Sequence, residues 1–203
     1  MTTKYLIKNV EVSGVVSDIA LENETITAIG KSLKSDGATE FDFTGSVALP
    51  GLVDLHTHLR EPGKEDAETV LSGSQAAARG GFTAVSAMAN TSPVADTAGV
   101  VEQVYRLGQS AGLVDVFPIG AVTQGIQGEH LAEIGAMADS AARVRVFSDD
   151  GNCVFDPLVM RRALEYIKKF DGVIAQHAQE PRLTQASQMN EGFVSSQLGL
   201  RCW

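Results

Sequence analysis

The sequence predicts an α/β fold with a parallel sheet, preceded by a short all-β segment. Two patterns support this prediction. From Val47 onward, short apolar runs alternate with longer segments of helical character, at about 30 residues per repeat, as in βαβ units. Before that point no helical period occurs, and Pro50-Gly51 marks the change of pattern. We therefore expect two domains, formed by residues 1–49 and 50–203.

The first domain is expected to consist of short strands. Residues 4–7, 15–21 and 25–29 are rich in β-branched side chains. Glu22-Asn23-Glu24 separates the last two runs and is typical of a hairpin turn.

The second domain is expected to alternate between strand and helix. A barrel and an open doubly wound sheet both fit this alternation. The first strand-to-helix connection, HTHLREPG, contains neither a GxGxxG nor a GxxxxGK[ST] motif, so a nucleotide-phosphate cradle is not supported. The strands are expected at 52–56, 83–88, 114–121, 144–148 and 173–176, and the helices at 67–79, 97–110, 129–142 and 157–170.

Composition narrows the class of protein. The 203 residues are 44% hydrophobic and 20% charged, which is typical of a globular chain. The net charge of −9 disfavours nucleic acid and anionic membranes as partners, although a small anionic ligand needs only one or two local cations. No signal peptide and no apolar run of about 18 residues is found, so we expect a cytoplasmic protein. Cys153 and Cys202 form no CxxC motif, which leaves His and carboxylate as metal ligands.

Three of the four histidines follow predicted strands, at the edge where parallel α/β folds carry their sites. His56 and His58 are two residues apart, so on a strand they point to the same face and can bind one ion. The alternative is a pair of strand histidines satisfied by hydrogen bonds. Asp149-Asp150-Gly151 follows the fourth strand and His177 the fifth, which adds a carboxylate and an imidazole at the same edge.

Each of these motifs also has a simpler interpretation. Asp149-Asp150-Gly151 alone is typical of a turn before a helix. His130 lies at the start of a predicted helix among acidic residues and is expected to be solvated, so we exclude it from the site.

Two further polar residues lie near these strand ends. Arg60 follows His58 in the loop; it either forms an ion pair with Glu61 or binds a substrate carboxylate through both guanidinium nitrogens. Asn90 ends the second strand, where it is either a turn residue or a second donor to the same anion.

These motifs together resemble the dihydroorotase family of the cyclic amidohydrolase superfamily. HxHxREPG, at the first barrel strand of that family, narrows the superfamily to dihydroorotases and allantoinases, and Asp-Asp-Gly at the fourth strand favours dihydroorotase. The resemblance extends from residue 1 to about residue 198. It implies a TIM-type (β/α) barrel, here with about five of eight strands, preceded by part of a small β-sandwich. The matching runs are PGLVDLHTHLREPG, MANT, FSDDG and QHAQE.

The resemblance also implies roles for individual residues. His56 and His58 bind one zinc, Asp150 bridges two zincs, and His177 binds the second, so one or two Zn²⁺ are expected. Hydantoinases use a carbamylated lysine as the bridge, whereas this chain has no lysine between Lys64 and Lys168.

Arg60 and Asn90 match the residues that bind the substrate carboxylate. The implied reaction is the reversible cyclisation of N-carbamoyl-L-aspartate to dihydroorotate in de novo pyrimidine biosynthesis, with a metal-bound hydroxide as nucleophile. The family's general acid/base Asp is expected beyond the C-terminus, so no catalytic residue is assigned here.

The chain is expected to be the front part of a larger barrel. Leu200–Trp203 does not read as a continuation of the family pattern, which suggests a truncated or frameshifted product. An incomplete barrel exposes a strand edge and apolar interior, so we expect poor solubility or self-association. Alternatives are an allantoinase-like ureide hydrolase and a non-catalytic fragment. Possible partners are a second copy of the chain and aspartate transcarbamoylase.

Overall fold

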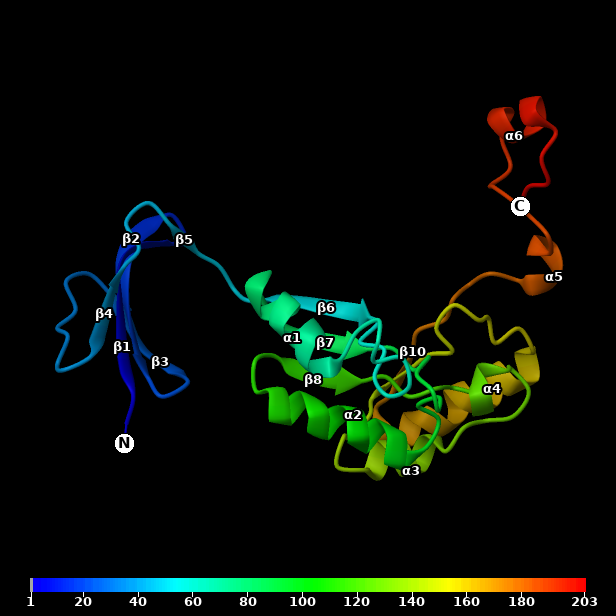
Figure 1. Cartoon of the computed structure of the whole chain (residues 1–203), viewed down its shortest axis with the longest axis horizontal. Helices are drawn as coiled ribbons and strands as arrows, with labels where there is room; N and C mark the ends of the chain where they lie inside the picture. Colours follow the sequence, from blue (N-terminus) through cyan, green and yellow to red (C-terminus); the bar gives the residue numbers. More distant parts are fainter. Residues whose placement is uncertain (1) are drawn as a thin grey trace. The chain divides into compact units, whose positions relative to one another are not determined.

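The computed structural model describes residues 2–203. Two compact units are found along the chain. The first ends at Pro50, and the second runs from Gly51 to Trp203. Each unit is described by itself below (Figure 1).

The first unit is one five-stranded sheet. β1, β2 and β3 form an antiparallel meander, and β4 and β5 pair with β1 in parallel. Asn23, with φ of 55°, lies in the tight turn between β2 and β3. β4 and β5 were not expected from the sequence. The strands are β1 (Lys4–Val12), β2 (Val15–Glu22), β3 (Thr25–Gly30), β4 (Thr39–Asp42) and β5 (Val47–Ala48).

Few apolar side chains of this sheet are buried. Leu6, Val10 and Ile19 are almost fully buried. The buried Asp18 carboxylate accepts the backbone N–H groups of Asn9 and Leu33, at 3.1 and 3.0 Å, and so ties the loop after β3 to β1. The buried charge is thus satisfied by hydrogen bonds.

The second unit alternates strand and helix, which confirms the α/β fold predicted from the sequence. The strands are β6 (Leu52–Thr57), β7 (Phe82–Ala87), β8 (Asp115–Pro118), β9 (Val146–Phe147) and β10 (Val173–Ile174). The helices are α1 (Val70–Arg79), α2 (Ala98–Ala111), α3 (Ile134–Asp139), α4 (Pro157–Ile167), α5 (Pro181–Thr184) and α6 (Phe193–Leu198), with 3₁₀ turns at Gln124–Ile126 and Lys168–Phe170.

The parallel strands form two groups. β6, β7 and β8 make a three-stranded sheet in that order, and β9 pairs with β10. A single parallel bridge between Gly120 and Phe147 joins the groups just beyond β8. Within residues 2–203 these strands do not close into a barrel.

Local signals in the sequence explain where the helices begin and end. Thr69 caps α1 by accepting the Ser72 N–H, and the Ser72 hydroxyl accepts the Thr69 N–H in return. The Asp156 carboxylate caps α4. α2 ends at Ala111 and is capped by Gly112, whose left-handed backbone (φ 59°) favours glycine.

The helix expected at 129–142 is shorter in the structure and begins only at Ile134. The preceding residues pair with the chain after β8 instead: the Gln124 N–H donates to the His130 carbonyl, and the Ala132 N–H donates to the Val122 carbonyl. His130 is exposed in this loop and not at a helix start, which corrects the expectation.

The helices cover one face of the three-stranded sheet. α1 and α2 bury Val85 on β7 and Val116 on β8, together with Leu59 from the loop after β6. Figure 1 shows α2 running beside β8. Among the described residues, no helix combines the length and apolar character that a membrane span requires.

Candidate metal centre

The first two candidate ligands lie where β6 ends. His56 is on β6, and its backbone N–H donates to the Asp54 carboxylate at 3.0 Å. His58 follows the strand, and the next residue, Leu59, is buried against α1 and β7. This apolar anchor fixes the backbone immediately after the histidine pair.

Asp150 reaches the same place from β9. Its backbone is left-handed, with φ of 53°, a conformation that aspartate tolerates better than most residues. Its side chain is 13% exposed. The two strand ends therefore bring a carboxylate to the histidine pair across nearly a hundred residues of sequence.

The neighbouring Asp149 holds this turn in place. It is buried, and its carboxylate accepts the backbone N–H groups of Val122 and Thr123, at 2.8 and 2.9 Å, and the Thr123 hydroxyl. Burial raises the pKa of Asp149, while these three hydrogen bonds oppose the rise. Asp149 thus ties the end of β9 to the chain after β8.

Three ligand atoms converge at this edge. One oxygen of Asp150 lies 3.2 Å from Nε2 of His56 and 3.8 Å from Nε2 of His58. All three ligand atoms lie within 4.8 Å of one another. The predicted His56, His58 and Asp150 are thus brought together.

This donor set fits a metal ion. Zinc bonds of about 2.0–2.1 Å in a tetrahedron place ligand atoms about 3.3 Å apart, close to the 3.2 Å between Asp150 and His56 and somewhat less than the 3.8 Å between Asp150 and His58. Two imidazoles and a carboxylate are also a common set for a catalytic zinc that keeps one open position. The three residues therefore form a possible metal site.

Asn90, in the segment that follows β7, contacts two of the three candidate ligands. Its Nδ2 donates to the second oxygen of Asp150 at 2.5 Å, and its Oδ1 lies 3.0 Å from Nδ1 of His58. The sequence placed Asn90 at this edge but did not predict these two contacts. Its expected contact with a substrate carboxylate remains a prediction.

Arg60 lies in the loop just beyond the histidine pair and is half-buried. The ion pair with Glu61 that we considered is not formed; the Glu61 carboxylate instead accepts the Val70 N–H at the start of α1, at 2.8 Å. Among the described residues, no carboxylate is paired with the Arg60 guanidinium. The role of Arg60 in substrate binding remains a prediction.

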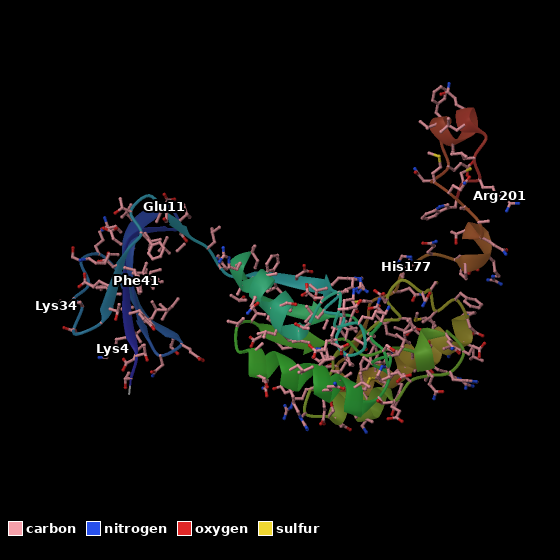
Figure 2. The ribbon with its side chains drawn as sticks, viewed as in Figure 1. Lys4, Glu11, Lys34, Phe41, His177 and Arg201 are labelled. Carbon is pink, nitrogen blue, oxygen red and sulfur yellow. The ribbon has the colours of Figure 1, made fainter. Side chains whose placement is uncertain are left out.

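The structure does not bring His177 into this group. His177 follows β10 and is exposed (Figure 2). Its Nε2 lies 2.9 Å from Oε1 of Gln179. Its predicted role as a ligand remains a prediction.

The sequence did not predict a structural role for Gln176, which lies just before His177. Its amide spans the backbone of Val154: Oε1 accepts the Val154 N–H at 3.3 Å, and Nε2 donates to the Val154 carbonyl at 3.0 Å. This links the chain after Asp150 to the end of β10. No sequence pattern marks a glutamine that binds backbone groups in this way. For Asp149, its position beside Asp150 at a strand end was a weak indication of a structural role.

The fold and this site define an α/β protein that presents histidine and carboxylate ligands at the carboxyl ends of parallel strands. Residues 45–202 match the family described as "Dihydro-orotase-like". The chain belongs to that family, which confirms the resemblance identified from its motifs.

Proteins of high sequence similarity include two named dihydroorotase. The one from Leifsonia xyli subsp. xyli is 68% identical over 190 residues, which are 94% of this chain and 43% of that protein. The one from Streptomyces coelicolor is 62% identical over 202 residues, which are 99% of this chain and 47% of that protein. The chain therefore spans less than half the length of these relatives.

Solved structures of hydantoinases share the fold. The chain matches an L-hydantoinase from Arthrobacter aurescens with a TM-score of 0.73 at 22% identity, over 92% of this chain and 43% of that one. It matches a D-hydantoinase from a Thermus species with a TM-score of 0.62 at 27% identity, over 89% and 41%. These similarities support the α/β fold.

Proposed function

We propose that this chain carries the metal-binding part of a zinc-dependent dihydroorotase. The proposed reaction is the reversible cyclisation of N-carbamoyl-L-aspartate to dihydroorotate, a step of pyrimidine biosynthesis in the cytoplasm. The observation that carries the proposal is the convergence of His56, His58 and Asp150 at one edge of the sheet. Membership of the dihydro-orotase-like family supports the choice of reaction.

The candidate ligands have the following roles in the proposed site. His56 and His58 would hold a zinc ion through Nε2, and Asp150 would hold it through a carboxylate oxygen. A bound zinc supplies Lewis-acid chemistry, which polarises a carbonyl and makes water a stronger nucleophile at neutral pH. A second zinc, shared by Asp150 and His177, is part of the proposal.

Arg60 would hold the substrate. Its guanidinium has no carboxylate partner within residues 2–203 and lies in the loop that follows His58, so it is available to bind a substrate carboxylate through two parallel hydrogen bonds. This local cation explains how a chain of net charge −9 can bind an anion. Orientation of the carbamoyl-aspartate against the metal site would then lower the entropic cost of cyclisation.

A chimera tests this function. Residues 1–198 would be joined to the remaining sequence of the Leifsonia xyli relative, and zinc content and carbamoyl-aspartate cyclisation would be measured on the same preparation. We expect zinc-dependent cyclisation, and we expect His56→Ala to abolish it while His130→Ala does not. Hydrolysis of allantoin without cyclisation of carbamoyl-aspartate would instead identify a ureide hydrolase.

The same assay on the 203-residue chain tests whether it acts alone. A chain that binds zinc without turnover would be a non-catalytic fragment, in agreement with the expectation that a general acid/base lies outside it. Association with a second copy or with aspartate transcarbamoylase is proposed as well, and sedimentation of the chain with and without that enzyme measures it.

A further inference from the structure

Asn90 lies between two of the candidate metal ligands, and its contacts carry an inference that rests on the proposed metal site. Its Nδ2 is 2.5 Å from one oxygen of Asp150, and its Oδ1 is 3.0 Å from Nδ1 of His58. A single amide therefore contacts ligands that follow two different strands.

The charge of Asp150 fixes the orientation of this amide. The reversed amide would place Oδ1 of Asn90 against the Asp150 carboxylate, where two acceptors repel each other. With Nδ2 facing Asp150, Oδ1 faces His58 and can only accept a hydrogen bond. When Nδ1 of His58 carries a proton, it donates to this oxygen.

This proton position determines which nitrogen of His58 can bind a metal. A neutral imidazole protonated at Nδ1 has its free lone pair on Nε2. Nε2 is the atom that lies 3.8 Å from the other oxygen of Asp150, inside the ligand group. Metal-bound histidines are commonly fixed in this way by an acceptor on the second nitrogen.

His56 provides an internal comparison. Its side chain is 58% exposed, against 30% for His58. Among the described residues, no side-chain acceptor contacts Nδ1 of His56. The two histidines therefore differ in how firmly their rings are held before a metal arrives.

We infer that Asn90 is a positioning residue of the metal centre: its contacts with His58 and Asp150 hold both side chains in place, favour the Nδ1–H tautomer of His58, and so raise the metal affinity. This role differs from the substrate contact expected from the family resemblance. A substrate contact alone leaves metal affinity unchanged when Asn90 is replaced, whereas a positioning role does not.

The test compares Zn²⁺ and Co²⁺ titrations of the 203-residue chain with those of Asn90→Leu, which keeps much of the volume and removes both hydrogen bonds. We expect metal binding to weaken roughly 10- to 100-fold. Asn190→Ala, at an exposed position outside the site, is the control and should bind as the wild type does. Asn90→Ser, a smaller and turn-compatible change, replaces Asn90→Leu if circular dichroism shows that the latter has unfolded.

Two readouts separate positioning from a general structural effect. In side-chain ¹⁵N spectra of metal-free protein, the Nδ1–H tautomer of His58 should be more populated in the wild type than in Asn90→Leu. In a double-mutant cycle, the effect of Asn90→Leu on metal affinity should shrink when His58 is already alanine.

The outcomes distinguish this inference from the proposed function. A wild type that binds metal, with Asn90→Leu within twofold of it and His58 in the Nε2–H tautomer, would overturn the inference and leave the metal site standing. If the wild type binds neither metal, the proposed function is contradicted. The tautomer of His58 in the wild type and in Asn90→Leu would then still test whether Asn90 orients the imidazole ring.

Discussion

The two faces of the sheet formed by β6, β7 and β8 differ sharply in how they are covered. On the face that packs against α1 and α2, Val85 is 2% exposed and Val116 is 5% exposed. Val53 and Phe117 lie on the opposite face and are 56% and 52% exposed. Apolar residues on both faces are typical of parallel strands that are buried on both sides. The strand sequences are therefore typical of a sheet that is packed on both faces. Within the described residues, only the face against α1 and α2 is packed.

The largest expected effect contrasts two neighbours on β8. Val116→Asp places an unpaired carboxylate in the helix-covered core and should cost at least about 3 kcal/mol of unfolding free energy. Phe117→Asp changes the uncovered face and should stay within about 1 kcal/mol of the wild type. Urea denaturation followed by circular dichroism measures both. Equal losses would contradict the distinction between the faces.

The next effect concerns how closely α2 approaches β8. A Cβ at Gly108 would lie 2.5 Å from Cβ of Val116, so Gly108→Ala should destabilise the fold by about 1–3 kcal/mol despite the better helix propensity of alanine. Gly99, on the same helix, has open space around it. Gly99→Ala should therefore stabilise by about 0.5–1 kcal/mol. Changes of the same sign in thermal melts would show that the close contact is absent.

A smaller effect is expected on association. Val53 and Leu55 are exposed on β6, the edge strand of its sheet, and apolar side chains on an open edge promote self-association. Replacing both with serine should weaken self-association about tenfold, or about 1.4 kcal/mol. Leu183→Ser, on α5 and 78% exposed, is the control. Sedimentation analysis that finds the wild type monomeric at every concentration would contradict this account.

The sequence predicted the site better than it predicted the lengths of the elements. His56 and His58 could be paired because side chains two apart on a strand share a face, and Asp149-Asp150 could be placed near them because parallel strands end at one edge. Both arguments depend only on local pattern and chain order, whereas the choice of Asp150 as the ligand came from the resemblance to the dihydroorotase family. The contacts of Asn90 depend on how the segment after β7 folds against β9, which local pattern does not determine.

Other features depended on long-range pairing. β4 and β5 are short segments that pair with β1, and Thr39-Glu-Phe-Asp42 has little alternation to reveal a strand. The expected helix at 129–142 lost its first turn to backbone hydrogen bonds with the chain after β8. In both cases tertiary hydrogen bonds decided the structure over local propensity.

Metal binding by the 203-residue chain tests the central claim most directly. In calorimetric titrations, we expect the wild type to bind Zn²⁺. We expect the affinity to fall by more than about 100-fold in His56→Ala and in Asp150→Ala. Each of these variants loses a metal ligand, and even the loss of a hydrogen bond that supports a ligand lowers metal affinity about 10- to 100-fold. His130→Ala removes an exposed histidine outside the cluster and should bind as the wild type does. Equal weakening in all three variants, or no binding by the wild type, would contradict the claim that these strand ends form a metal centre.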